Sequence, residues 1–259
     1  MDPIAFTIGP FTVRWYGLLI ASAILIGYFG ANRSVKKQGL NQDDFLSLIL
    51  IVVVCGVICA RLYYVIFEWS YYCEHPEHII AIWRGGLAIH GGILGGLVSG
   101  ILACRHYKIN FWQAADIFAP WVVLAQAIGR WGNFFNQEAY GYAVDPNVIP
   151  WAMYIDGAYR HPTFLYESIW DFLTFCLLIY LSRKPFLKQG ECFLIYLISY
   201  SAVRFFIEGL RTDSLMLGDF RVAQLMSITL ILLAAGVFIY RRKKHLAQDK
   251  PWLFKQEKQ

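Results

Sequence analysis

The chain has 259 residues, of which 58% are hydrophobic and 16% charged, and its formal net charge is +5. Its mean hydropathy is +0.46. An ordinary soluble domain carries about 25% charged residues, so this composition excludes that class and indicates a polytopic membrane protein with membrane lipid, and no nucleic acid, as a partner.

Apolar runs recur along the whole chain, and most are close to the ~20 residues that a bilayer requires. They cover residues 13–31, 46–67, 87–104, 114–128, 165–182, 191–207 and 222–240. We therefore predict an all-α fold with about seven transmembrane helices. The fourth run is the shortest, and it spans a bilayer only if Phe111 and Trp112, or the segment at Arg130, extend it.

The basic residues predict the orientation, because short cytoplasmic loops collect Lys and Arg. With seven spans, every lysine falls in the loops after the first, third and fifth spans or in the tail. We expect the N-terminus outside and the C-terminus in the cytoplasm. Residues 1–259 then form a single integral membrane domain, with a periplasmic arm at 141–160 and a basic cytoplasmic tail at 241–259. The first run lacks the basic flank and cleavage site of a removed signal peptide.

The cationic residues left on the outer side, or within a span, are all arginines. Examples are Arg61, Arg130, Arg160, Arg204 and Arg211. A guanidinium can bind a phosphate through two parallel hydrogen bonds, and phospholipids supply that group. The alternative is that these side chains snorkel from helix ends to the membrane surface.

The second span and the loop after it show no clear metal or disulfide pattern. Cys55 and Cys59 lie one helical turn apart, which favours helix packing. Glu74, His75, Glu77 and His78 superficially resemble metal ligands, but no partner pattern supports them. We therefore favour a solvated loop and expect no metal and no organic cofactor.

His90 opens a glycine-rich stretch, H-G-G-I-L-G-G-L-V-S-G. Its glycines recur at small-x-x-x-small spacing, which brings helix backbones close together, although they could also leave room for an acyl chain. His90 itself is either a hydrogen-bonded core residue or a base, since imidazole titrates near neutrality and can accept a thiol proton.

The most informative segment is G-R-W-G-N-F-F-N-Q-E-A-Y-G at 129–141, directly after the fourth run. Polar groups at such a position usually carry function. Arg130, Asn133, Asn136 and Glu138 should emerge together at one membrane face. Asp116, at the start of the run, lies about 20 Å from Arg130 along a helix, and we interpret it as structural.

Two later segments place polar residues at the same predicted depth. In R-F-F-I-E-G-L-R, the spacing of Arg204, Glu208 and Arg211 predicts one helix face on which the carboxylate holds both guanidinium groups. That arrangement is either a local ion-pair ladder or part of a site. In H-P-T-F-L-Y-E, Tyr166 and Glu167 could line a site, while the residues around His161 could simply start a helix.

Five stretches together resemble the prolipoprotein diacylglyceryl transferases of bacterial inner membranes. They are R-W-Y-G at 14–17, H-G-G-I-L-G-G at 90–96, the 129–141 segment, H-P-T-F-L-Y-E at 161–167 and R-F-F-I-E-G-L-R at 204–211. The resemblance implies transfer of the diacylglyceryl group of phosphatidylglycerol to the lipobox cysteine of a prolipoprotein signal peptide, with release of glycerol phosphate. It also implies a multi-pass protein of the bacterial inner membrane, with its active site towards the outer leaflet.

The resemblance and the chemistry together assign roles to particular residues. Arg130 and Arg204 would hold the lipid phosphate, with Arg211 and Asn133 assisting. Glu138 and Glu208 would orient the arginines. Asn136 and Gly141 complete the expected substrate-binding set. His90 and Tyr16 are the candidate bases, and Tyr16 is the poorer one because a phenol titrates near ~10.

Other functions fit the sequence less well. A transporter should show internal repeats and paired broken helices, and we find none in the sequence. A non-catalytic scaffold that binds anionic phospholipid is the more serious alternative, since it could use the same arginines. Nothing in the sequence requires more than a monomer.

Overall fold

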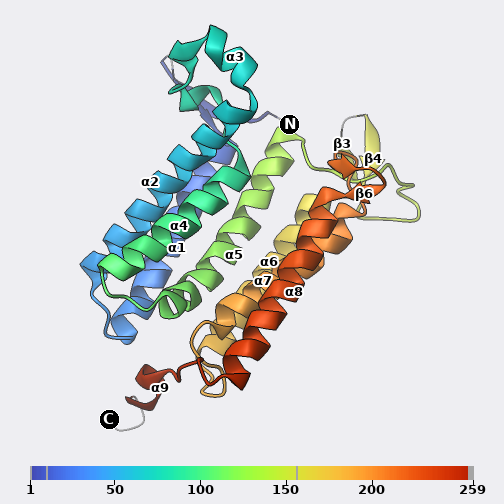
Figure 1. Ribbon diagram of the computed structural model, residues 1–259. Coiled ribbons are helices and arrows are strands. Elements are labelled where there is room, and N and C mark those ends of the chain that lie inside the picture. The colour runs from blue at the N-terminus through green and yellow to red at the C-terminus, as the bar shows by residue number, and fades with distance from the viewer. Residues whose placement is uncertain (1, 10, 156, 256–259) are drawn as a thin grey trace. The chain divides into compact units, whose positions relative to one another are not determined.

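The computed structural model describes residues 2–9, 11–155 and 157–255, and it is mostly helical (Figure 1). Residues 256–259 of the expected tail, Lys258 among them, lie outside this description. The helices are α1 (Trp15–Lys37), α2 (Gln42–Phe67), α3 (Trp69–Glu74), η1 (Pro76–His78), η2 (Ile82–Arg84), α4 (Ile89–His106), α5 (Phe111–Asn136), α6 (Thr163–Ser182), α7 (Glu191–Glu208), α8 (Val222–Lys243) and α9 (Pro251–Lys255). The strands are β1 (Ile4–Ile8), β2 (Phe11–Arg14), β3 (Met153–Ile155), β4 (Ala158–Arg160), β5 (Met216–Leu217) and β6 (Phe220–Arg221).

Five of the described helices, α1, α2, α5, α6 and α8, are long and apolar enough to cross a membrane. The prediction of a helical membrane protein is therefore confirmed. The remaining two predicted spans correspond to α4 and α7, of 18 residues each. The total of seven and the orientation of the termini stay predictions.

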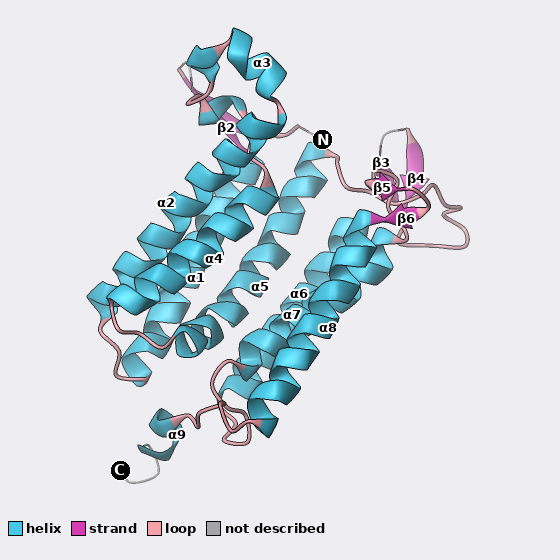
Figure 2. Ribbon diagram, in the orientation of Figure 1, coloured by secondary structure: helices cyan, strands magenta, loops and turns pink. Residues whose placement is uncertain are grey.

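The strands were not predicted, and they pair only locally. Each of the three sheets is a two-stranded antiparallel hairpin: β1 with β2, β3 with β4, and β5 with β6. Figure 2 shows them in magenta against the cyan helices. The β3–β4 hairpin lies in the predicted arm at 141–160, and an isolated bridge joins Ala143 of that arm to Arg160.

The chain folds into two compact units, one up to Ser34 and from Ala115 onward, the other from Val35 to Ala114. In the first unit, α6, α7 and α8 lie side by side (Figure 1). Its core is built from α5, α6, α7 and the loop before α7. The fully or nearly fully buried members are Ala119, Val123, Leu178, Leu187, Cys192 and Tyr196.

Helix α1 packs antiparallel against α5 within this first unit. Near one end, the ring of Trp15 stacks on that of Phe135 with centroids 5.0 Å apart. Further along, the ring of Trp121 occupies the space where a side chain at Gly30 would lie. The glycine therefore lets a large aromatic ring bring the two helices together.

In the second unit, α2 and α4 pack through the glycine stripe. A side chain at Gly91 would collide with the backbone of Cys59 and Ala60, and one at Gly95 would collide with the side chain of Cys59. The packing interpretation of both the glycines and Cys59 is therefore confirmed. Close backbone approach of this kind is how membrane helices associate when no hydrophobic drive is available.

Arg61 of α2 is buried and is used entirely within this second unit. Its guanidinium donates to the carbonyl oxygens of His78, Ile79, Gly85 and Gly86 at 2.7–2.8 Å. Arg61 therefore supplies hydrogen-bond donors to four backbone carbonyl groups in the loop between α2 and α4. Arg61 is therefore neither a snorkelling residue nor a phosphate ligand.

Asp116 of α5 caps the start of α7. Its two carboxylate oxygens accept hydrogen bonds from the backbone N–H groups of Gly190, at 2.8 Å, and Phe193, at 3.0 Å. These N–H groups at a helix start lack partners within the helix. The structural interpretation of Asp116 is confirmed, and its role is that of an N-cap supplied by a neighbouring helix.

Helix α5 is longer than the fourth apolar run. It begins at Phe111 and ends at Asn136, so it is extended at both ends, as a spanning length requires. As a consequence, Arg130, Asn133 and Asn136 lie within its last turns rather than in a loop after it. Helical spacing then sets their relative directions.

We expect Asp116→Ala to lower the free energy of unfolding by about 1–3 kcal/mol, because it leaves two buried backbone donors without acceptors. The measurement is unfolding of the detergent-solubilised protein by heat or denaturant. Asp43→Ala is the matched control, since Asp43 is an exposed residue in the first turn of α2. Equal stability of the two variants would contradict the capping role.

Candidate active site

The site is centred on Glu167, a carboxylate in the first turns of α6 that is only 2% exposed. Its Oε2 forms an ion pair with Nε of Arg130 from α5. Its Oε1 accepts from Nη1 of Arg204 from α7 at 2.6 Å. One carboxylate therefore joins the guanidinium groups of two other helices.

Arg204 has a second carboxylate partner, since its Nη2 lies 2.7 Å from Oε2 of Glu208, one turn along α7. Glu208 is 2% exposed. On the other side, Nη2 of Arg130 donates weakly to the Tyr200 hydroxyl oxygen at 3.4 Å. An isolated charge among apolar helices costs several kcal/mol, so each of these charges depends on its partner.

The end of α5 carries a second polar group of side chains. Oε1 of Glu138 accepts from the side-chain amides of Asn133, at 3.0 Å, and Asn136, at 3.2 Å. The flanking residues Gln137 and Ala139 have φ of 53° and 57°, a conformation that costs non-glycine residues about 1–3 kcal/mol. These backbone conformations direct Glu138 towards the two asparagines, which its carboxylate contacts.

We expected Glu138 to orient an arginine, but its side chain has other contacts. In the part of the chain that the structure describes, its side chain accepts from amides, and the carboxylate that pairs with both Arg130 and Arg204 is Glu167. The expected role of Glu208 is supported for Arg204 only. A signal for Glu167 was present in the sequence, because a carboxylate inside an apolar run must have a partner.

The predicted helix face joining Glu208 to Arg211 is wrong. Helix α7 ends at Glu208, and Arg211 beyond it forms a two-pronged pair with Asp213, from Nε at 2.9 Å and from Nη2 at 2.6 Å. This pairing lowers the pKa of Asp213. The carboxylate therefore contributes stability above its unfolded pKa, and that contribution disappears as the pH falls through the lower folded value.

Gly141 lies in an isolated bridge with Arg211. Its N–H donates to the His161 carbonyl at 3.0 Å, and a side chain at this position would meet His161, Leu210 and Thr163. The close approach of these segments explains the glycine. A contact of Gly141 with substrate stays a prediction.

Arg221 forms several hydrogen bonds with the segment that follows α7. Nη1 donates to the carbonyl oxygens of Glu208 and Arg211, and Nη2 donates to the Tyr142 hydroxyl at 2.7 Å. Nη1 also donates to Ser214 Oγ at 3.0 Å. All of these acceptors are neutral, so the positive charge of Arg221 is not cancelled by any of them.

The two candidate bases lie in different parts of the chain. Tyr16, at the start of α1, is 40% exposed, and its ring occupies the space beside Gly132, between Arg130 and Asn133 in sequence. His90 is exposed in the first turn of α4, with its ring 6.2 Å from that of Tyr63. His90 belongs to the second unit, so its catalytic role stays a prediction.

Asp171 was not anticipated from the sequence. It lies one turn after Glu167 on α6 and is fully buried. Among the described residues, neither of its carboxylate oxygens has a hydrogen-bond partner. Residues at i and i+4 share a helix face, so this second carboxyl group lies on the face that carries Glu167.

We expect Glu167→Gln to lower the free energy of unfolding by about 3–5 kcal/mol, because removal of one partner leaves buried charges unpaired. Glu138→Gln is the matched control. It removes a carboxylate that is exposed and accepts only from amides, and it should cost about 1 kcal/mol. Equal losses measured by denaturant unfolding would contradict a central role for Glu167.

Asp171→Leu should act in the opposite direction. Replacing a buried carboxyl group that has no hydrogen-bond partner with an apolar side chain of similar shape should raise the free energy of unfolding by about 1–3 kcal/mol. The same unfolding experiment tests this. A loss of stability would mean that Asp171 has a partner that compensates its burial.

Comparisons with known proteins identify the family of the chain. The family model described as "Prolipoprotein diacylglyceryl transferase" matches residues 3–240. The phosphatidylglycerol–prolipoprotein diacylglyceryl transferases of Staphylococcus aureus strains Newman and JH9 are each 52% identical to this chain over 255 residues, covering 95% of this chain and 91% of theirs. The chain belongs to the prolipoprotein diacylglyceryl transferase family, and it is a transferase.

Proposed function

We propose that this protein transfers the diacylglyceryl group of phosphatidylglycerol to the cysteine thiol of a prolipoprotein signal peptide, at the lipobox. Family membership supports the overall reaction. The observation that carries the assignment of the site is the sharing of Glu167 by Arg130 and Arg204 among apolar helices.

The reaction forms one bond and breaks one bond. The cysteine sulfur attacks an sp3 carbon of the lipid glycerol as a thiolate, since the thiolate is the nucleophilic form. A thioether forms, and the carbon–oxygen bond to the phosphate breaks. The electron pair leaves with that oxygen as glycerol phosphate, and the thiol proton passes to a base. The site must therefore bind a phosphate whose negative charge grows.

Arg130 and Arg204 are suited to that task because their carboxylate pairs leave donors unused. A guanidinium has five N–H groups. Nη2 of Arg130 donates to Tyr200, and Nη1 of Arg204 donates to Glu167. Nε of Arg130 and Nη2 of Arg204 form ion pairs with Glu167 and Glu208. The remaining N–H groups are held in fixed directions by Glu167 and Glu208. Preorganised donors of this kind stabilise developing charge without further rearrangement.

Arg221 also favours an anion here. Arg130 and Arg204 pair with Glu167 and Glu208, and Arg211 pairs with Asp213. Arg221 donates only to neutral oxygens in its described contacts. Its positive charge at this end of α7, where Glu208 is located, is therefore not cancelled by any of its own acceptors. Asn133 can add a neutral donor, and Arg211 can assist from the adjoining loop.

His90 and Tyr16 remain the candidate bases. An imidazole near neutrality suits the transfer of a thiol proton. Tyr16 can instead donate a hydrogen bond to the glycerol or pack against the acyl ester, since its ring already lies beside Gly132. A chain with Tyr16→Phe that keeps most of its activity would leave His90 as the base.

We infer that the site faces the outer leaflet of the bacterial inner membrane. Basic residues gather at the other end of α7, where Arg242 pairs with Glu191 and Arg241 donates to Gln189. From Glu191 to Arg204 is about 20 Å along a helix. Since basic ends face the cytoplasm, the end with Arg204 and Glu208 faces outward, which matches seven spans with the N-terminus outside.

A cavity of about 310 Å³ lies at the end of α5 and is a candidate seat for the lipobox segment. Its lining residues are Phe134, Gln137, Ala152, Met153, Tyr154 and Ile155. Phe134 adjoins Asn133, so the cavity is next to the polar end of α5. The arm at 141–160 would cover the bound peptide, and one copy of the chain, acting as a single catalytic domain, would suffice.

We expect Arg130→Lys and Arg204→Lys each to reduce transfer at least ~100-fold, because an ammonium cannot reproduce the two-pronged donors of a guanidinium. The assay mixes purified protein with phosphatidylglycerol vesicles and a lipobox peptide. It follows both the thioether-linked peptide and the released glycerol phosphate. Arg33→Lys is the matched control, because Arg33 is exposed near the other end of α1.

The same assay separates the enzyme from a lipid-binding scaffold. Wild-type protein that binds the vesicles yet releases no glycerol phosphate would favour the scaffold. Full activity in both lysine variants would leave the transferase in place and remove the two arginines from the phosphate site. Circular dichroism and the unfolding midpoint show that each variant is folded.

A further inference from the structure

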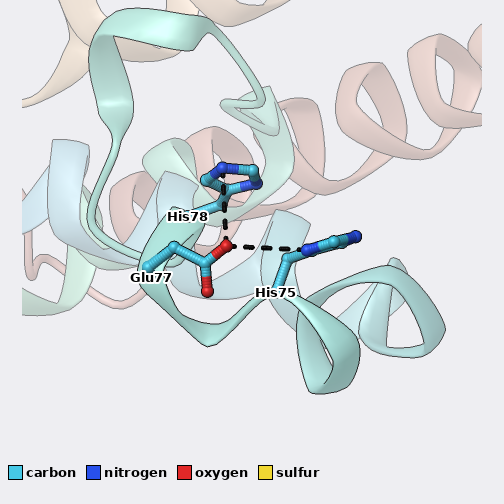
Figure 3. Close-up of side chains that lie close together, drawn as sticks. All are labelled: His75, Glu77 and His78. Carbon is cyan, nitrogen blue, oxygen red and sulfur yellow. Dashed lines mark ion pairs between the residues drawn. The ribbon is translucent and has the colours of Figure 1, made fainter.

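The loop between α2 and α4 brings three side chains of metal-ligating types together. This loop is far in sequence from Arg130 and Arg204. The three side chains are those of His75, Glu77 and His78, and their nearest ligand atoms all lie within 4.8 Å of one another. Figure 3 shows the carboxylate of Glu77 between the two imidazole rings. Oε1 of Glu77 lies 3.5 Å from Nδ1 of His75 and 3.7 Å from Nε2 of His78.

These distances suit a shared metal ion. Zinc binds histidine nitrogen and carboxylate oxygen at about 2.0–2.2 Å. Two ligand atoms on a tetrahedral ion at that distance are therefore roughly 3.4 Å apart. The two separations from Glu77 exceed this value by only a few tenths of an ångström, and the ligand atoms of the two histidines lie within 4.8 Å of each other. Side-chain rotations would bring all three atoms onto one ion.

The backbone that carries these ligands is fixed. Nη2 of Arg61 donates to the carbonyl oxygen of His78 at 2.7 Å, and its other nitrogens hold the residues that follow. Pro76 restricts the backbone between His75 and Glu77. A loop held by a buried guanidinium presents its side chains with less loss of entropy than a free loop would.

His78 also has a supporting partner of the kind that metal-bound histidines need. The Tyr71 hydroxyl lies 2.7 Å from Nδ1 of His78. With a metal ion on Nε2, Nδ1–H donates to this hydroxyl oxygen, which fixes the ring and its tautomer. The Tyr71 ring also lies 5.0 Å from that of His75, so one tyrosine positions both imidazoles.

The carboxylate between the rings is available as an anion. It is exposed, and one of its oxygens is shared by the two imidazole rings. Simple ion pairing explains the convergence poorly, because exposed pairs contribute only about 0–1 kcal/mol. Two imidazoles and one carboxylate are a typical ligand set for zinc, nickel or copper, whereas magnesium and calcium prefer oxygen ligands.

We propose that His75, Glu77 and His78 form a binding site for a divalent late transition metal ion, with zinc as the representative ion. Three protein ligands leave a fourth position open to solvent. A bound ion fastens η1 to the end of α3 and so stabilises the loop that precedes His90. The sequence pattern alone favoured a solvated loop because it could not show that Tyr71 and Arg61 support the ligands.

The test is zinc binding to the full-length protein in detergent, with its affinity tag removed and after treatment with a chelator. Zn²⁺ is titrated in competition with a chromophoric chelator. We expect one ion per chain, at least ~10-fold weaker binding in the His75→Ala, His78→Ala double variant, and ~10-fold weaker binding in Tyr71→Phe. Zinc should also slow amide hydrogen exchange in residues 75–86 of the wild type.

Two matched variants separate this site from other zinc ligands. His106→Ala removes another exposed histidine of the same unit, and Cys73→Ser removes the exposed thiol of the same loop. Both should bind zinc as the wild type does. Unchanged affinity in the double histidine variant, or loss of binding in Cys73→Ser alone, would overturn the proposal. Unfolding midpoints in chelator show that all variants are folded.

Discussion

The carboxylate of Glu167 is the constraint on which the first unit depends. Between membrane helices, apolar packing gives little preference for one register over another, whereas a buried charge must meet its partner. By pairing with Arg130 and Arg204, Glu167 fixes the register of α5, α6 and α7 at one end. Asp116 does the same for α5 and α7 at the other end through two backbone N–H groups.

The two polar contacts differ in whether their groups still have hydrogen-bonding capacity for a ligand. Both oxygens of Asp116 accept backbone hydrogen bonds, and nearby Lys250 is 2% exposed, so that end is closed around its own partners. At the other end, Arg130 and Arg204 keep unused N–H groups, and their side chains are 19% and 20% exposed. In the proposed reaction, this end would bind the phosphate without breaking its described contacts.

The sequence predicted what depends on composition and local spacing. The apolar runs predicted the positions of the long helices, the glycine stripe predicted that α4 packs closely against another helix, and the spanning length predicted the extension of α5. What it missed depends on distant contacts. Helix α7 stops at Glu208, whose carbonyl accepts from Arg221, thirteen residues later, and no local pattern contains that hydrogen bond. The error about Arg211 follows from it.

The sequence could not distinguish the outer arginines from one another, because only their predicted position relative to the membrane put them in one group. The structure divides them by acceptor: Arg61 and Arg221 meet neutral oxygens, whereas Arg130 and Arg204 meet carboxylates. For the proposed reaction this difference is useful. A carboxylate-paired arginine carries little net charge and binds the lipid phosphate only moderately, yet its spare donors are aimed before charge develops. Such interactions strengthen towards the transition state, so the arrangement favours turnover over tight retention of glycerol phosphate.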